Sequence, residues 1–216
     1  MNRLFQKAMD PISSETHFIG ACLSTIGLVF IILLGIIRQS SPMILIATVV
    51  FGISLIALYS ASATYHFFNG SEKIKLILRK LDHSMIYILI VGTYTPVVVY
   101  CMKAPHSYYF LGILWTLAII GILVKVLWIN APRMIGTLIY LLLGWSVVFD
   151  FHSFQGIPIE CLTLIAIGGI MYSIGAIIYI IKKPNLFEKF QFHELFHIFV
   201  MLGSFFHYIA IIHFIL

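Results

Sequence analysis

The sequence predicts an all-α membrane protein, built as a seven-transmembrane helix bundle with its N-terminus inside and its C-terminus outside the cell. Three observations lead to this prediction: the composition, seven long apolar segments, and the uneven distribution of Lys and Arg between the connectors. Of the 216 residues, 61% are hydrophobic and only 10% are charged. Soluble globular domains are about 25% charged, so lipid is the expected solvent for most of this chain.

Seven apolar segments have the length that a membrane-crossing helix needs, which is about 20 residues for a hydrocarbon layer of about 30 Å. Helices are expected because lipid cannot satisfy free backbone groups, and no alternating pattern indicates a barrel. The predicted spans are residues 16–37, 44–66, 82–102, 108–128, 134–150, 161–181 and 195–215. Polar residues, Gly and Pro punctuate the short connectors. We therefore expect one seven-transmembrane domain, 1–216.

The basic residues predict the orientation of the bundle, because short loops rich in Lys and Arg stay in the cytoplasm. Eleven of the 13 basic residues fall on the side of the N-terminus. These are Arg3, Lys7, Lys73, Lys75, Arg79, Lys80, Lys125, Arg133, Lys182, Lys183 and Lys189. Only Arg38 and Lys103 fall on the other side. We expect a multi-pass protein of the plasma membrane whose net charge of +5 reflects topology, with no nucleic-acid partner.

Metal-ligand chemistry concentrates at the cytoplasmic ends of three spans. His66 ends the second span, Asp82 begins the third, and His193 and His197 begin the seventh, where their spacing of four places both on one helix face. Three imidazoles with an open fourth position are typical of a catalytic Zn²⁺ site, in which the metal acidifies water. The sequence predicts His66, His193 and His197 as ligands. Asp82 would hold or deprotonate that water, with Ser62 as its hydrogen-bonding neighbour.

Simpler roles are open for several of these residues. Asp82 could cap the third span, and Ser62 could bond to a backbone carbonyl one turn earlier. Glu194 completes the H-E-x-x-H signature of zinc proteases, in which the glutamate is the general base. A protease is not favoured, because no soluble catalytic domain is expected.

The other histidines are predicted to lie away from the metal. His207 comes ten residues after His197, or about 15 Å along a helix, which is too far for the same metal shell. Its role and that of His213 stay open. His83 is expected at the interface, pointing about 100° away from Asp82. Three further histidines at span ends, His17, His106 and His152, are given no role.

The residues in Ser62-x-x-x-His66, Asp82 and His193-x-x-x-His197 resemble the signature of the hemolysin III family. This family lies within the progestin and adipoQ receptor superfamily, a grouping related to alkaline ceramidases. Residues 81–87, 92–96 and 193–207 are especially similar to that branch. The resemblance implies seven helices, a cytoplasmic N-terminus, and a zinc ion bound by the three histidines, with Asp82 contacting the zinc-bound water.

Two differences separate the chain from the adiponectin-receptor branch of the same superfamily. The chain lacks a long cytoplasmic N-terminal region, and it carries Glu194 within the paired-histidine segment. Both differences speak against hormone recognition.

Three functions are compatible with these residues. The first is a zinc-dependent hydrolase of a lipid amide, acting in membrane lipid homeostasis, with a lipid amide or fatty acid inside the bundle and membrane lipids as partners. The second is a non-enzymatic membrane sensor or regulator, in which structural zinc clamps the second and seventh spans. The third is a cytolysin or pore, although no polar face crosses the bilayer. The sequence leaves substrate and oligomeric state open.

Overall fold

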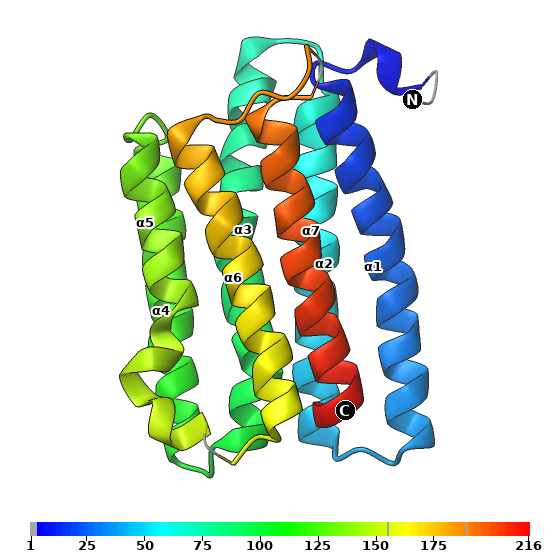
Figure 1. The fold of residues 1–216 in the computed structure, drawn as a ribbon, viewed down its shortest axis with the longest axis vertical. Coiled ribbons are helices and arrows are strands. Elements are labelled where there is room, and N and C mark those ends of the chain that lie inside the picture. The colour runs from blue at the N-terminus through cyan, green and yellow to red at the C-terminus, as the bar shows by residue number, and fades with distance from the viewer. Residues whose placement is uncertain (1–3, 155, 189) are drawn as a thin grey trace.

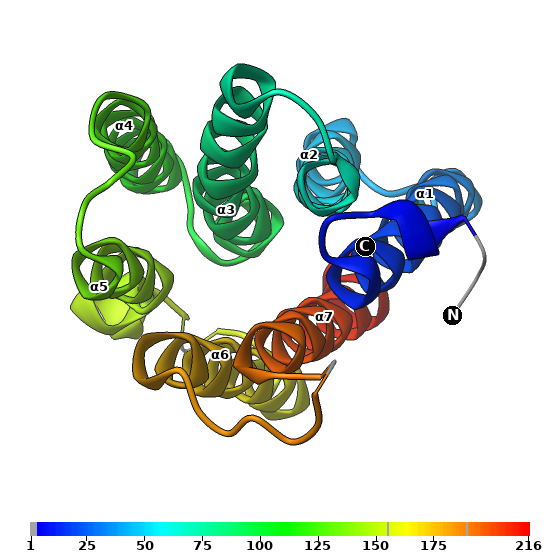
Figure 2. The ribbon, with the colours of Figure 1, turned by 90° about the horizontal axis from the view of Figure 1, so that it is seen from above.

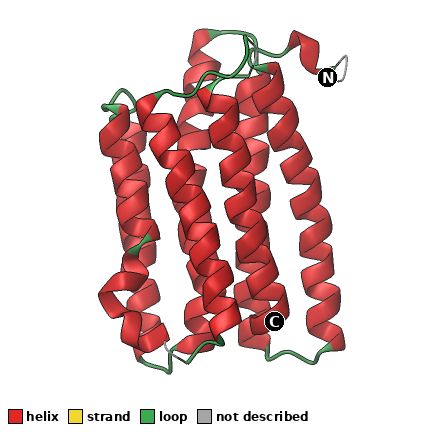
Figure 3. Ribbon diagram, in the orientation of Figure 1, coloured by secondary structure: helices red, strands yellow, loops and turns green. Residues whose placement is uncertain are grey.

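The computed structural model describes residues 4–154, 156–188 and 190–216. Within these ranges seven helical segments are long and apolar enough to cross a membrane, and no β-strand occurs (Figures 1 and 3). The chain runs up and down, so its two ends lie at opposite ends of the bundle. The predicted all-α, seven-transmembrane fold class is confirmed. Arg3 and Lys189, which contributed to the charge count, lie outside the described residues.

The helices follow the predicted spans, with several extended at their beginnings. They are α1 Pro11–Ile37, α2 Pro42–Phe67, α3 Glu72–Cys101, α4 His106–Leu127, α5 Arg133–Gly144, α6 Ile159–Ile181 and α7 Phe192–Ala210. A short 3₁₀ turn, Phe5–Lys7, precedes α1. Two further segments, the 3₁₀ segment Ser146–Phe154 and the π-helical turn Ile211–Ile215, extend the spans of α5 and α7.

Local sequence explains where three helices begin. Pro11 and Pro42 occupy the first positions of α1 and α2, where a missing N–H costs nothing and the fixed φ suits a helix. The beginning of α3 differs from the prediction: the helix starts at Glu72, ten residues before Asp82. The intervening Lys, Arg, Leu and Ile residues favour a helix, so the segment that was predicted to be a charged connector forms the first turns of α3. Asp82 therefore lies inside α3, and its interpretation as a helix cap is wrong.

The fifth span is broken, whereas the sequence predicted one helix over 134–150. After Gly144 the chain continues as 3₁₀ turns with a non-helical residue at Asp150 (φ −141°, ψ 43°). Tyr94 of α3 compensates at the break, because its hydroxyl donates to the Gly144 carbonyl at 2.7 Å and accepts from the Val147 N–H at 3.0 Å. Backbone groups freed inside a membrane need such partners. The break thus depends on one tyrosine from a neighbouring helix.

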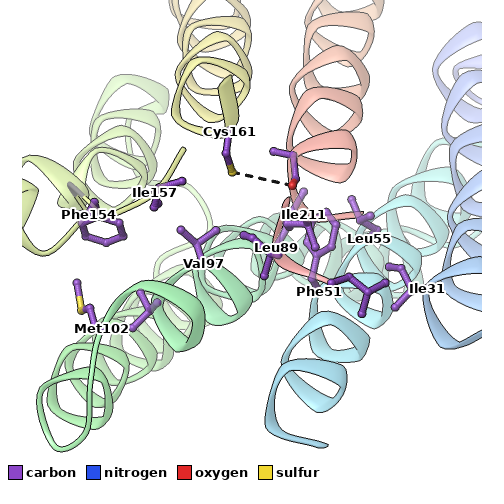
Figure 4. Packing of buried hydrophobic residues seen from close by; sticks show 14 of the residues in the cluster. Ile31, Phe51, Leu55, Leu89, Val97, Met102, Phe154, Ile157, Cys161 and Ile211 are labelled. Atoms are coloured by element: carbon purple, nitrogen blue, oxygen red, sulfur yellow. Dashed lines mark hydrogen bonds between the residues drawn. The ribbon is translucent and has the colours of Figure 1, made fainter. Parts of the chain in front are cut away.

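Viewed from above, the seven helices follow one another around a ring in chain order, and α7 lies between α6 and α1 (Figure 2). Apolar side chains from α1, α2, α3, α6 and the end of the seventh span, including the π-helical turn, form one buried cluster. Ile31, Phe51, Leu89 and Ile211 are buried there (Figure 4). Closing the ring brings the beginning of α7 to the end of α2, which positions the candidate site.

Packing between α3 and α4 depends on a glycine, which gives a test of the fold. A Cβ at Gly121 would collide with the ring of the buried Tyr87, whereas Gly112 on the same helix has open space around it. We predict that Gly121→Ala lowers the free energy of unfolding by about 1–3 kcal/mol through overpacking. Thermal unfolding of the purified protein measures this effect.

Gly112→Ala is the matched control, since it makes the same change on α4 without a collision. It is expected to be neutral or slightly stabilising, because alanine favours a helix over glycine. Equal melting temperatures for the two variants would contradict the α3–α4 packing.

Candidate metal centre

Three histidine side chains converge at the end of the bundle that carries the N-terminus. His66 comes from the last turn of α2, and His193 and His197 come from the first two turns of α7. One nitrogen from each lies within 4.8 Å of the others, and the Nε2 atoms of His66 and His193 are 3.2 Å apart. Tetrahedral coordination at Zn–N distances of about 2.0–2.1 Å places neighbouring nitrogens about 3.3 Å apart. The donor set therefore fits a zinc ion.

His66 is held in position by an acidic residue that the sequence analysis missed. Asp10, directly before α1, accepts a hydrogen bond from His66 Nδ1 through Oδ2 at 2.8 Å, and its backbone N–H donates to the His66 carbonyl at 3.0 Å. With its proton on Nδ1, the imidazole presents the Nε2 lone pair to the other histidines. Metal-binding histidines in proteins are usually oriented by such a carboxylate.

The charge of Asp10 is favoured by the same contact. The hydrogen bond with His66 holds the pKa of the Asp10 carboxyl below its usual value, although partial burial opposes the shift. The carboxylate is therefore ionised at neutral pH. One feature of the sequence could have indicated this role: Asp10 is an acidic residue just before the first span, on the side of the membrane where His66 was expected.

Asp82 and Ser62 lie beside the three histidines. The Asp82 carboxyl is buried, and the Ser62 hydroxyl and the His66 ring lie close enough to influence its charge. Asp82 is not among the residues whose ligand atoms converge, so the structure places it next to the histidine group instead of within it. Ser62 and Asp82 both line the cavity, and this proximity is consistent with the predicted pairing.

His17 corrects the sequence analysis, which put it at a span end without a role. It lies inside α1, is 3% exposed, and stacks on His197 with ring centroids 3.7 Å apart and planes within 10°. Neither ring nitrogen of His17, nor Nδ1 of His197, has a hydrogen-bond partner within the described part of the chain. Unpaired buried nitrogens cost stability. His17 thus forms one wall of the site without aiming a nitrogen at the group of three.

Glu194 has a structural role at the start of α7. Its Oε2 accepts from the Gln191 backbone N–H at 2.9 Å in a capping box, and its Oε1 accepts from the Ser13 hydroxyl of α1 at 3.0 Å. Both carboxylate oxygens are therefore engaged in joining helix ends. This arrangement does not support the general-base role that a zinc-protease interpretation requires.

An elongated cavity of about 420 Å³ begins at the histidines and extends through the bundle interior. His17, Ser62, Asp82, His193 and His197 line its polar end. The far end is lined by apolar residues, among them Phe154, Ile157 and Leu162. A cavity of this size is typical of small-molecule sites, and its shape suits a molecule with a polar head and an apolar chain.

Two histidines that were expected away from the site also line this cavity. His83 borders its polar end, and its backbone carbonyl accepts a hydrogen bond from the Tyr140 hydroxyl at 3.0 Å. His207 borders the cavity deeper in the membrane, stacks on Tyr172, and has Nδ1 2.8 Å from the Gly203 carbonyl. His106 instead pairs with Asp150, at 2.6 Å.

Comparison with known proteins agrees with these features. The family model described as "Haemolysin-III related" matches residues 5–208. Hemolysin-3 of Bacillus cereus is 34% identical over 94% of this chain and 91% of its own length. A hemolysin-3 homolog of Bacillus subtilis (strain 168) is 35% identical over 88% of this chain and 86% of its own.

Similarity extends to plants. Heptahelical transmembrane protein 4 of Arabidopsis thaliana is 28% identical over 69% of this chain and 44% of its own length. The name of that relative agrees with the seven helices described here. This chain therefore belongs to the haemolysin-III related family of multi-pass membrane proteins.

Proposed function

We propose that this protein is a metal-dependent hydrolase that cleaves an amide bond of a membrane lipid. One observation carries the proposal: three histidine nitrogens converge beside a buried carboxylate, and two of these histidines and the carboxylate line the polar end of a largely apolar cavity. His66, His193 and His197 would hold Zn²⁺. When bound, the ion would supply Lewis-acid polarisation of a carbonyl group and lower the pKa of water.

The chain's own residues divide the remaining work. Asp82 takes the proton from the attacking water and returns it to the leaving amine, as a general base and then a general acid. Ser62 donates a hydrogen bond that orients the Asp82 carboxylate, and Asp10 fixes the ring of His66. The apolar walls hold the acyl chain, so that its carbonyl stops at the histidines.

A second function has one observation in its favour. The histidine group joins the end of α2 to the start of α7, so a metal there would clamp two helices that close the ring. A membrane sensor with structural zinc would use this clamp alone. The pore interpretation is less favoured, because the far part of the cavity is lined by apolar side chains.

We also propose that the histidine end of the bundle faces the cytoplasm, because the connectors at that end carry most of the Lys and Arg residues. If the C-terminus lies outside the cell, a fluorescent protein that does not fold after export should be dark when fused after Leu216. Alkaline phosphatase, which is active only outside the cytoplasm, should be active at the same position. The same reporters in the connector after Leu127 should give the opposite result. A cytoplasmic C-terminus would contradict this orientation.

Metal content tests the ligand assignment. We predict about one zinc per wild-type molecule, loss of zinc in His193→Ala, and a 10- to 100-fold weaker zinc affinity in Asp10→Asn, because an orienting carboxylate is worth about that much. Elemental analysis and competition with a zinc chelator measure these values.

His213→Ala is the matched control, since it removes an exposed histidine from the far end of the same span. It should retain zinc at the wild-type level. Full zinc content in His193→Ala would refute the ligand assignment.

Asp82 separates the enzyme from the sensor. We predict that Asp82→Asn keeps zinc and fold while amide hydrolysis falls by about 10²–10⁴-fold, the usual contribution of a general base. Purified protein is assayed with N-acyl lipids, chosen by comparing the lipids of cells with and without it. Asp150→Asn, at the other end of the bundle, should leave turnover unchanged.

Equal turnover in Asp82→Asn and wild type, with equal zinc, would exclude the proposed mechanism. Zinc-dependent thermal stability without hydrolysis of any N-acyl lipid would favour the sensor.

A further inference from the structure

A buried cation stands at the polar end of the cavity. Lys125 belongs to the last turn of α4, lines the cavity and is only 9% exposed. None of the ion pairs within the described ranges includes it. Lysines are rarely buried without a partner, because desolvating an unpaired ammonium is costly. The position of Lys125 therefore calls for an explanation beyond packing.

The Lys125 ammonium lies against α5. A Cβ built at Gly136 would be 3.4 Å from Lys125 Nζ, so the glycine leaves the ammonium room beside the helix backbone. Arg133 lies one turn earlier on the same face of α5, and both α5 residues line the cavity. Two cations therefore border the same part of the cavity.

Arg133 is held in place without an acidic partner among the described residues. Its Nη1 donates to the Tyr179 carbonyl at 3.1 Å, and its guanidinium lies 4.4 Å from the centroid of the Tyr179 ring. A guanidinium has five N–H donors, so one backbone contact leaves donors for another acceptor. Because the ring fixes the guanidinium, little further ordering is needed to bind an anion.

The surrounding charges favour an anion at this point. Lys125 lies within electrostatic range of Asp82, and Arg133 lies within range of His193. Asp82 is the one carboxylate among the lining residues of the described chain, against the two cations. Away from this end the lining is mostly apolar and carries no further charged side chain of Lys, Arg, Asp or Glu among the described residues. The cavity thus combines a positive head with an apolar remainder.

We infer that the cavity binds an amphiphile whose head group is an anion, a carboxylate or a phosphate, held by Lys125 and Arg133. This inference rests on the proposed function and deepens it: the lipid amide that is cleaved carries a negative charge near the amide bond. The anion lies beside the histidine group, and the alkyl chain occupies the apolar part of the cavity.

Binding of three amphiphiles with the same chain tests this inference: dodecanoate, dodecyl phosphate and the neutral dodecanamide. The protein is embedded in nanodiscs of zwitterionic lipid, and binding is measured by calorimetry at neutral pH. The wild type should bind at least one of the two anions about tenfold or more tightly than the amide. The preferred anion identifies the head group as carboxylate or phosphate.

Variants locate the anion. Lys125→Met should abolish the preference, and Lys125→Arg should retain most of it, because the charge remains. Lys73→Met removes an exposed lysine at the same end of the bundle and should bind like the wild type. Arg133→Gln should weaken the preference and provides a second measurement should Lys125→Met fail to fold.

The same titrations after zinc removal show whether the anion is bound by Lys125 and Arg133 or by zinc at the histidine group. The preference should persist, because Lys125 and Arg133 are not metal ligands. Equal binding of all three amphiphiles by the wild type, survival of the preference in both Lys125→Met and Arg133→Gln, or its loss on zinc removal would overturn the inference.

Binding is measured without turnover, so the two proposals fail separately. Anion-selective binding without hydrolysis would support this inference and contradict the proposed hydrolase activity. Hydrolysis of neutral amides without anion preference would do the reverse.

Discussion

The inability of lipid to form hydrogen bonds governs this structure. Every polar group inside the bundle must find its partner in the protein, and most do so locally. Thr95 donates to the Val91 carbonyl one turn earlier, at 2.8 Å. Deeper in the bundle, Tyr59 donates to Ser204 at 2.6 Å, and Tyr172 lies 2.8 Å from the same hydroxyl. The second arrangement joins α2, α7 and α6 through one serine.

Against this background the polar end of the cavity stands out. Asp82, Lys125 and His197 are each buried, and His197 keeps a ring nitrogen without a partner among the described residues. Ionisable groups inside membrane proteins are costly, and they usually mark functional pathways or sites. Their presence at one depth, contributed by α3, α4 and α7, is therefore better explained by ligand binding than by stability.

The sequence was sufficient to predict the fold class and the convergence of the three histidines, because the length of a membrane span and the spacing of residues along a helix are local properties. Four spans, an even number, separate the end of α2 from the start of α7 and bring both to one side of the membrane, so His66 could be combined with His193. Asp10 and His17 could not be found in this way. Asp10 contacts His66 of α2 and His17 stacks on His197 of α7, so their roles depend on how α1 packs against these two helices, which a one-dimensional hydropathy pattern does not contain.

The break after Gly144 escaped prediction for a related reason. Its sequence is as apolar as a continuous helix, and Tyr94, fifty residues earlier, supplies a donor and an acceptor to the backbone at that point. Hydropathy records how much apolar surface a segment has, whereas the local conformation depends on a partner from another helix. Val147 and Phe151, which follow the break, line the cavity.

A structural zinc clamp between α2 and α7 leaves the buried carboxylate and the cavity unexplained, and these two features favour an enzyme over a sensor. A structural zinc site is complete with four protein ligands and has no use for a nearby carboxylate. Here the converging group has three histidines, and Asp82 lies beside them on the wall of a cavity, with Ser62 close by. A clamp between α2 and α7 would need none of these additional features. Burying Asp82 costs stability that only a reaction, or a ligand recognised by this carboxylate, would offset.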